Sequence, residues 1–286
     1  MMNKVKVFIN PITAKDAKVT LRGHSLPVLV ICGNLLLFVA VLFGLFGRAR
    51  GMELDGVVDY RQFLYIYGAA AAILSLLTLL AGCLITAGSI SGEKEAGTWD
   101  LLKSSGLSPL RIAGGKLLSA AHIVLVLIAS AFPVLLMPLL YGGPGLVSVL
   151  RVLASLVPLA FFAMTAGLFA SASARTTVAS AAISAVTVLL FSAVPVLITV
   201  LIDPVAAGKT NYAAYLLVLD PLMPVGSVLL RQIGEFGYLE QNFAAMGFAG
   251  SSPLVRNLTP VSFLVQILIS LLFFVLSVTK ISKAGD

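Results

Sequence analysis

Residues 63–90 read FLYIYGAAAAILSLLTLLAGCLITAGSI and carry no charged side chain along their whole length. A helix needs about 20 apolar residues to cross about 30 Å of hydrocarbon. Barrel strands would instead show short segments in which apolar and polar residues alternate. This stretch therefore predicts a transmembrane helix, and the rest of the chain can be compared with it.

Five further blocks resemble residues 63–90 when the chain is divided at its charged residues. Backbone amides cannot remain unpaired in lipid, so each block is interpreted as a helix. Residues 142–145 are too few to form more than a tight connection, which predicts a hairpin of the third and fourth helices. The expected fold is an all-α membrane protein with six transmembrane helices, at residues 26–46, 63–90, 117–141, 152–174, 177–202 and 260–278.

The overall composition agrees with this class. Of the 286 residues, 59% are hydrophobic and 11% are charged, and the mean hydropathy is +1.05. Ordinary soluble domains carry about 25% charged residues, which they need to cover their surface. A water-soluble globular fold is therefore excluded.

The distribution of basic residues predicts the orientation. Cytoplasmic segments of membrane proteins carry an excess of Lys and Arg. With the N-terminus inside, 12 of the 19 basic residues are cytoplasmic, so both termini are expected there, in the plasma membrane of a bacterium. The net charge of +7 then reflects topology and attraction to anionic lipid, and no nucleic-acid partner is expected. The inner residues are Lys4, Lys6, Lys15, Lys18, Arg22, Lys94, Lys103, Arg111, Lys116, Arg175, Lys280 and Lys283.

Two segments flank or interrupt the spans. Residues 1–24 mix apolar and basic side chains and predict a cytoplasmic amphipathic segment that lies along the inner surface. Residues 25–286 form the six-helix domain. Its extracellular segment, residues 203–259, has no block of span length and is expected to form short interfacial helices. That segment is interpreted equally as an exit gate or as a cap on the bundle.

Several function classes lack their usual residues. No acidic residue falls within a span core, so ion-coupled transport has no obvious carrier of the coupling charge. The sequence Gly115-Lys116 is followed by Leu117, where a phosphate-binding loop requires Ser or Thr. Cys32 and Cys83 lie in separate spans without metal-ligand spacing. No catalytic residue, metal site or cofactor is therefore expected in this chain.

The connection at residues 91–116, SGEKEAGTWDLLKSSGLSPLRIAGGK, carries the functional signal. Glu93 and Glu95 are expected near the N-terminus of a short helix, where negative charge is favoured. Trp99 and Leu102 then share one face, with Leu101 beside them. Residue Gly106 is expected to end the helix. An amphipathic helix of this kind needs lipid headgroups or a protein groove to cover its apolar face.

The order of parts in this connection resembles the permease subunits of type 2 ATP-binding-cassette transporters, a mostly export-type family. An acidic cluster, Gly-Thr and a Leu pair are followed by a turn, a basic residue and Gly-Lys before the next helix. The sequence departs from the family at the turn, which is Ser105-Gly106, and Arg111 stands alone. The matching residues are Glu93, Glu95, Gly97, Thr98, Leu101, Leu102, Arg111, Gly115 and Lys116.

The resemblance implies a mechanism and partners. The connection would be a coupling helix that docks in a cleft of a separate ATPase subunit, which would hold ATP and Mg. Two permeases, identical or homologous, would be needed for two ATPases. The alternatives are a plain charged connector and an ATP-independent protein such as a lipid scramblase or an assembly scaffold. The residues implied to contact the ATPase are Glu93, Glu95, Gly97, Thr98, Trp99, Leu101 and Leu102.

Overall fold

The computed structural model describes residues 25–55, 61–104, 106–206, 212–248 and 257–283. The predicted amphipathic segment at residues 1–24 lies outside these ranges. Every element within them is a helix. In chain order they are α2 (Ser25–Asp55), α3 (Arg61–Glu95), α4 (Trp99–Ser104), α5 (Pro109–Ser130), α6 (Phe132–Leu136), η1 (Met137–Tyr141), α7 (Leu146–Ser173), α8 (Thr177–Ala206), η2 (Tyr212–Leu219), α9 (Met223–Gln232), α10 (Phe236–Ala245) and α12 (Leu258–Lys283).

The six predicted spans are confirmed among the described residues. Each predicted block lies in a helix, or in one run of helices, that is long and apolar enough to cross a membrane. The third span consists of α5, α6 and η1 in succession, and Pro133 and Pro138 lie at the starts of the second and third pieces. Proline lacks the N–H that continues a helix, which explains the interruptions. The short connection before α7 confirms the predicted hairpin.

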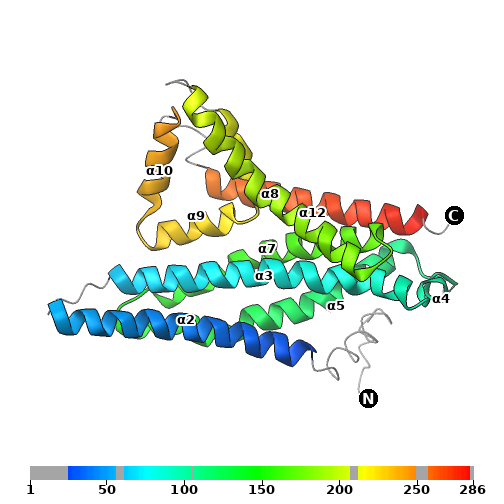
Figure 1. Ribbon diagram of the computed structural model, residues 1–286, viewed down its shortest axis with the longest axis horizontal. Helices are drawn as coiled ribbons and strands as arrows, with labels where there is room; N and C mark the ends of the chain where they lie inside the picture. Colours follow the sequence, from blue (N-terminus) through cyan, green and yellow to red (C-terminus); the bar gives the residue numbers. More distant parts are fainter. Residues whose placement is uncertain (1–24, 56–60, 105, 207–211, 249–256, 284–286) are drawn as a thin grey trace, which may run out of the picture.

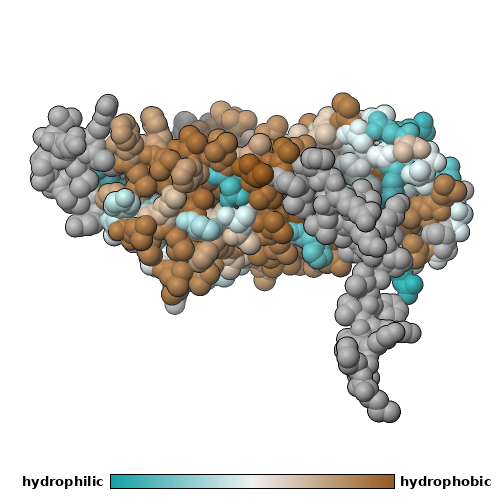
Figure 2. All heavy atoms as spheres, turned by 90° about the horizontal axis from the view of Figure 1, so that it is seen from below, coloured by the Kyte–Doolittle hydropathy of each residue, from teal (hydrophilic) through white to brown (hydrophobic). Residues whose placement is uncertain are grey.

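The helices α2, α3, α5, α7 and α12 run roughly along one axis, and α8 crosses them obliquely (Figure 1). The helix α4 and the C-terminal end of α12 lie at one end of the molecule, which we call the α4 end; α9 and α10 lie toward the other, the α9 end. Figure 2 shows apolar residues along most of the length, with hydrophilic residues gathered toward the α4 end. This banding is the pattern of a protein with a hydrocarbon-facing middle.

Among the described helices, α3 and α7 share the most extensive contact. At Gly82, a Cβ atom would lie 2.7 Å from the Cβ of Ala163. At Gly167, a Cβ atom would collide with the Thr86 hydroxyl and the Cys83 carbonyl. On α7, Ala163, Gly167 and Ser171 recur at four-residue spacing, the arrangement of small residues that lets two membrane helices approach closely. The two helices therefore form the central pair of the bundle.

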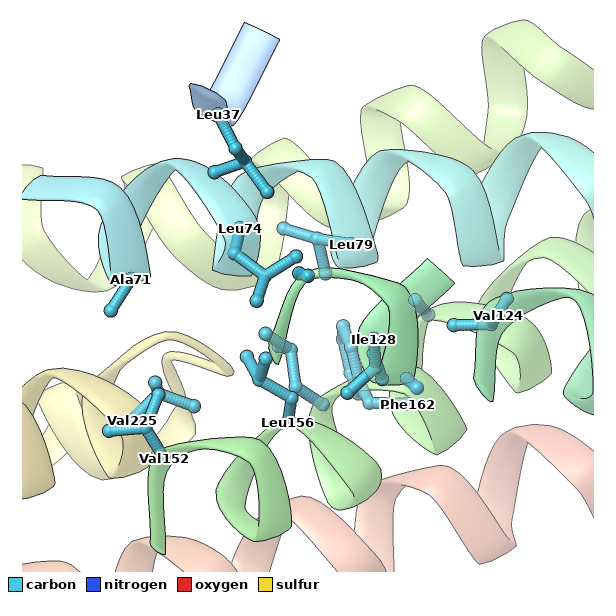
Figure 3. Packing of buried hydrophobic residues seen from close by; sticks show 14 of the residues in the cluster. Leu37, Ala71, Leu74, Leu79, Val124, Ile128, Val152, Leu156, Phe162 and Val225 are labelled. Carbon is cyan, nitrogen blue, oxygen red and sulfur yellow. The ribbon is translucent and has the colours of Figure 1, made fainter. Parts of the chain in front are cut away.

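A core of buried apolar side chains surrounds this pair (Figure 3). Leu37 of α2 lies over Leu74 of α3, and Leu156 and Phe162 of α7 lie on the other side of α3. Val225 of α9 is 1% exposed and lies beside Val152 of α7. The core thus joins spans that are distant in sequence and includes one short helix from the 203–259 segment.

That short helix, α9, belongs to the segment that was expected to form short interfacial helices. The segment forms η2, α9 and α10 and contains no span-length helix in its described part, as predicted. However, η2 and α9 meet at an angle of 97°, and Val225 and Leu229 of α9 belong to the main core. The apolar face of α9 packs against α7 and α12, a burial within the chain that the sequence did not indicate, while its predicted interfacial position stays a prediction.

The buried serine and threonine hydroxyl groups of α3 find partners within their own helix. Each donates a hydrogen bond to the carbonyl four residues earlier, at 2.7 to 2.8 Å. In an apolar environment an unpaired polar group is costly, so this local pairing lets polar side chains occupy a membrane-embedded core. The residues concerned are Ser75, Thr78, Thr86 and Ser91.

Candidate partner-docking site

The end of α3 determines where the loop between the second and third spans begins. Glu93 and Glu95 lie in the last turn of α3, which continues to Glu95. The expectation that they start a new helix was wrong, because no residue in this stretch breaks the helix before Gly97. Negative charge at a helix C-terminus is unfavourable. These carboxylates therefore need nearby cations.

Gly97 and Thr98 terminate α3. Gly97 has a φ of +68°, in the left-handed region that favours glycine. Its N–H donates to the Lys94 carbonyl at 3.2 Å, and the Thr98 N–H donates to the Glu93 carbonyl at 3.0 Å. This pair of bonds is the Schellman arrangement, which satisfies carbonyls at the end of a helix. The Gly-Thr sequence therefore sets the angle at which the chain leaves α3.

The helix α4 follows at once and presents two different faces. Trp99 is 7% exposed, and its ring lies in an apolar cluster formed by several spans. Leu102 is half-buried against that cluster, whereas Leu101 is 72% exposed. The Trp99 face is thus covered by the chain itself, and Leu101 is the apolar residue that α4 presents outward. The buried members of the cluster besides Trp99 are Ile90, Ile112, Ala113, Leu168, Ala172 and Ile281.

Glu93 is held by an ion pair with α5. The Lys116 ammonium lies 2.7 Å from Glu93 Oε1, and the two side chains are 6% and 19% exposed. Losing one partner of a buried pair costs about 3 to 5 kcal/mol, because the other charge is left uncompensated. The second oxygen, Glu93 Oε2, is buried and has no hydrogen-bond partner in the described part of the chain. The pair fixes the start of α5 against the end of α3.

Lys94 binds the C-terminal end of α7. Its ammonium donates to the carbonyls of Ala172 and Ala174 at 2.7 Å each and to that of Ser171 at 3.3 Å. The last carbonyls of a helix have no partner within the helix, and a cation there contributes up to about 2 kcal/mol in a partly buried setting. The same ammonium lies 5.9 Å from the centroid of the Trp99 ring. Lys94 thus lies between α4 and α7.

The predicted site residues therefore divide into three groups. Glu93, Trp99 and the half-buried Leu102 belong to the chain's own packing, and Gly97 and Thr98 shape the turn. Glu95 and Leu101 are exposed and lie near one another in sequence on either side of that turn.

The sequence interpretation gave no role to Lys94 or Ser171. Ser171 is fully buried, and its Oγ accepts hydrogen bonds from the N–H groups of Ile90 and Ser91 at 2.9 Å each. The spacing of Ala163, Gly167 and Ser171 was a signal for this face of α7, since small residues four apart are typical of close helix contacts. Nothing in the sequence indicated the partner of Lys94.

The α9 end holds a second polar group. The Tyr67 hydroxyl donates to Gln232 Oε1 at 2.9 Å, and Gln232 Nε2 donates to the Ser148 carbonyl at 3.1 Å. Nearby in sequence, Asp220 accepts a hydrogen bond from the Leu222 N–H at 2.9 Å. These contacts attach α9 to α3 and α7. They bring together no nucleophile with a base, and the described residues contain no cluster of three His, Cys, Asp or Glu placed to hold a metal ion.

Comparison with known protein families identifies a match for this chain. A family model described as "ABC-2 family transporter protein" matches residues 11–281 of the chain. No curated protein matches it. The matched range includes the loop helix α4 and the six long helices, except for the last two residues of α12.

Proposed function

Because this family model covers nearly the whole chain, the protein belongs to the ABC-2 family of transporter proteins, and we propose that it is the permease subunit of an exporter driven by a separate ATPase subunit. Family membership makes the chain a membrane component of a transporter. The export direction and the ATP-driven partner are the parts that we add.

The observation that carries the proposal is the position of α4. This short helix is held on four spans by Trp99 and lies at the hydrophilic end of the molecule (Figures 1 and 2). Leu101 is exposed on it, between Asp100 and the half-buried Leu102. An apolar side chain on a rigid, water-facing helix is suited to a groove on a protein partner.

The charge distribution supports a cytoplasmic location for the α4 end. Lys94, Lys103, Arg111, Lys116, Arg175, Lys280 and Lys283 all belong to the helix ends and connections there. Positive residues favour the cytoplasmic side, where ATP and an ATPase subunit are available. The location is therefore consistent with docking of an ATPase on α4, and ATP and Mg would bind to that partner.

A second permease copy, or a homologous permease, completes the proposed assembly. In the most apolar stretches of α2 and α8, only 17% of the residues are buried within the chain. In the corresponding stretch of α3, 50% are buried. Their apolar surfaces therefore face lipid or a neighbouring permease. Two ATPases that close on each other require two permeases, one for each docking site.

The test is the substitution Leu101→Asp. The tagged protein should be purified from cells of its source, and the recovered ATPase subunit identified by its phosphate-binding loop and its ATP hydrolysis. We expect Leu101→Asp to reduce ATPase recovery strongly, because burying a Leu contributes about 1.5 to 3 kcal/mol and a stranded carboxylate adds a further cost. Insertion in the membrane should be unchanged.

The matched control is Leu140→Asp. Leu140 is 79% exposed and lies in η1, at the opposite end of the third span. It should leave ATPase recovery at the parental level. Full recovery of the ATPase with Leu101→Asp would show that α4 is only a connector, and the absence of any ATPase from the parental sample would overturn the proposed function.

A further inference from the structure

The Lys94 ammonium group contacts both the loop helix α4 and the C-terminal end of α7. Lys94 Nζ donates to the carbonyls of Ala172 and Ala174 at 2.7 Å each, and it lies 5.9 Å from the centroid of the Trp99 ring. Trp99 is the first residue of α4, and Ala174 is the residue at which α7 ends. The contact is therefore made at the beginning of one helix and at the end of another.

The end of α7 is also a corner. Ala174 is extended, with φ −88° and ψ 159°, and α8 begins three residues later at Thr177. The first turns of α8 are tied to α3, because Ser180 Oγ donates to the Ala87 carbonyl at 2.7 Å. The corner between α7 and α8 is thus held by α3 at two points, Lys94 and Ala87.

The covalent connections of α4 do not reach this corner. α4 is joined directly to α3 and α5, and the α3–α5 contact is reinforced by Glu93 and Lys116. α7 follows much later in the chain, so movement of α4 can reach it only through noncovalent contacts. Beside α4, these contacts include the apolar cluster that contains Trp99, Leu168 and Ala172, and the hydrogen bonds of Lys94.

We propose that Lys94 is a positioning residue for transport: it transmits displacement of α4 to the corner between α7 and α8, so that these two spans move when the partner moves the loop helix. The inference rests on the proposed function, since it requires a partner that displaces α4. The charged hydrogen bonds to three carbonyls resist sliding more than apolar contacts do, because they are directional.

The experiment measures movement of the corner between α7 and α8. Cys32 and Cys83 are replaced, and a spin label is attached at Val178, which is 78% exposed in the first turn of α8. The complex with the recovered ATPase contains two permease copies, each with one label. The two labels are separated by a single distance. Pulsed electron paramagnetic resonance measures this distance without nucleotide and after trapping with ATP, Mg and vanadate. The parental complex should show a change in distance.

The decisive variant is Lys94→Met, which keeps the length of the side chain and removes its hydrogen bonds. It should retain the ATPase and lower the ratio of complexes with the changed distance to those with the unchanged distance by about twofold or more, which is the size of effect typical of coupling residues. Lys94→Arg should restore the change, because a guanidinium can donate to the same carbonyls. The control is Lys103→Met: the Lys103 ammonium also lies 5.7 Å from the Trp99 ring, but it pairs with Asp100 on its own helix, so the change should persist.

The outcomes separate this inference from the function on which it rests. A parental-size change in distance with Lys94→Met, ATPase bound, would show that the apolar contacts suffice and would overturn the inference. If Lys94→Met is not recovered folded, Trp99→Leu tests the same contact from the α4 side. It keeps an apolar side chain and removes the ring beside Lys94. A parental-size change in the distance between labels with Trp99→Leu also overturns the inference. A parental sample without ATPase overturns the proposed function itself.

Discussion

At the scale of single residues, Asp220 is unusual because it is a carboxyl group in a partly buried turn between η2 and α9. Burial raises the pKa of Asp220 to about 6 from an ordinary 3.8, although the hydrogen bond from the Leu222 N–H acts in the opposite direction. The folded protein therefore binds a proton at Asp220 more tightly than the unfolded chain. This contribution to stability is complete below about pH 3.8 and is lost as the pH rises through about 6.

Asp220→Asn should remove this dependence. Asn keeps an acceptor for the Leu222 N–H and carries no charge, so at pH 7 the variant should be more stable by on the order of 2 kcal/mol, after allowing for partial solvent exposure. Thermal unfolding in detergent at several pH values between 4 and 8 measures this. Glu240→Gln, at an exposed position of α10, is the control and should leave the profile unchanged. A parental profile that is flat across this range would contradict the prediction.

At the scale of elements, the contact of α3 with α7 can be tested with a pair of glycines. Replacing Gly by Ala in a helix is worth about 1 kcal/mol by propensity alone. At Gly88 of α3 nothing lies within 4 Å of an added Cβ atom, whereas at Gly167 of α7 the Cβ atom would meet the Cys83 carbonyl. Gly88→Ala should therefore maintain or raise the unfolding temperature, and Gly167→Ala should lower it, with a cost of about 1 to 3 kcal/mol. Equal unfolding temperatures for the two variants would mean that the helices separate easily.

The elements also show what could be predicted from the sequence. The spans were predictable because apolar length alone decides whether a helix can cross the bilayer. The packing of α9 against α7 could not be predicted. A short amphipathic helix buries the same face whether it lies on lipid headgroups or on another helix. The role of Lys94 was also hidden: its acceptors are backbone carbonyls about 80 residues away, and carbonyls have no sequence signature.

At the scale of the whole molecule, the orientation is testable through the two ends of the bundle. Lys283 ends α12 at the α4 end, and Tyr212, which is 72% exposed, begins η2 in the segment between the last two long helices (Figure 1). In a chain without Cys32 and Cys83, Tyr212→Cys should react with a membrane-impermeant thiol reagent in intact cells. Lys283→Cys should react only after the cells are opened. The reverse pattern would place α4 outside and remove it from reach of a cytoplasmic ATPase.

The local pairing of hydroxyl groups in α3 has a consequence for the biogenesis of the protein. During synthesis α3 enters the membrane well before its main neighbour, α7, has been made. Because Ser75, Thr78, Thr86 and Ser91 each donate to a carbonyl of α3 itself, these four hydroxyl groups are already paired when the helix is alone in lipid. Ser171 makes its contacts with the Ile90 and Ser91 amides only after α3 is in place. Insertion of α3 can thus be completed early, and its association with α7 follows at a later stage, with these four hydroxyl groups paired throughout.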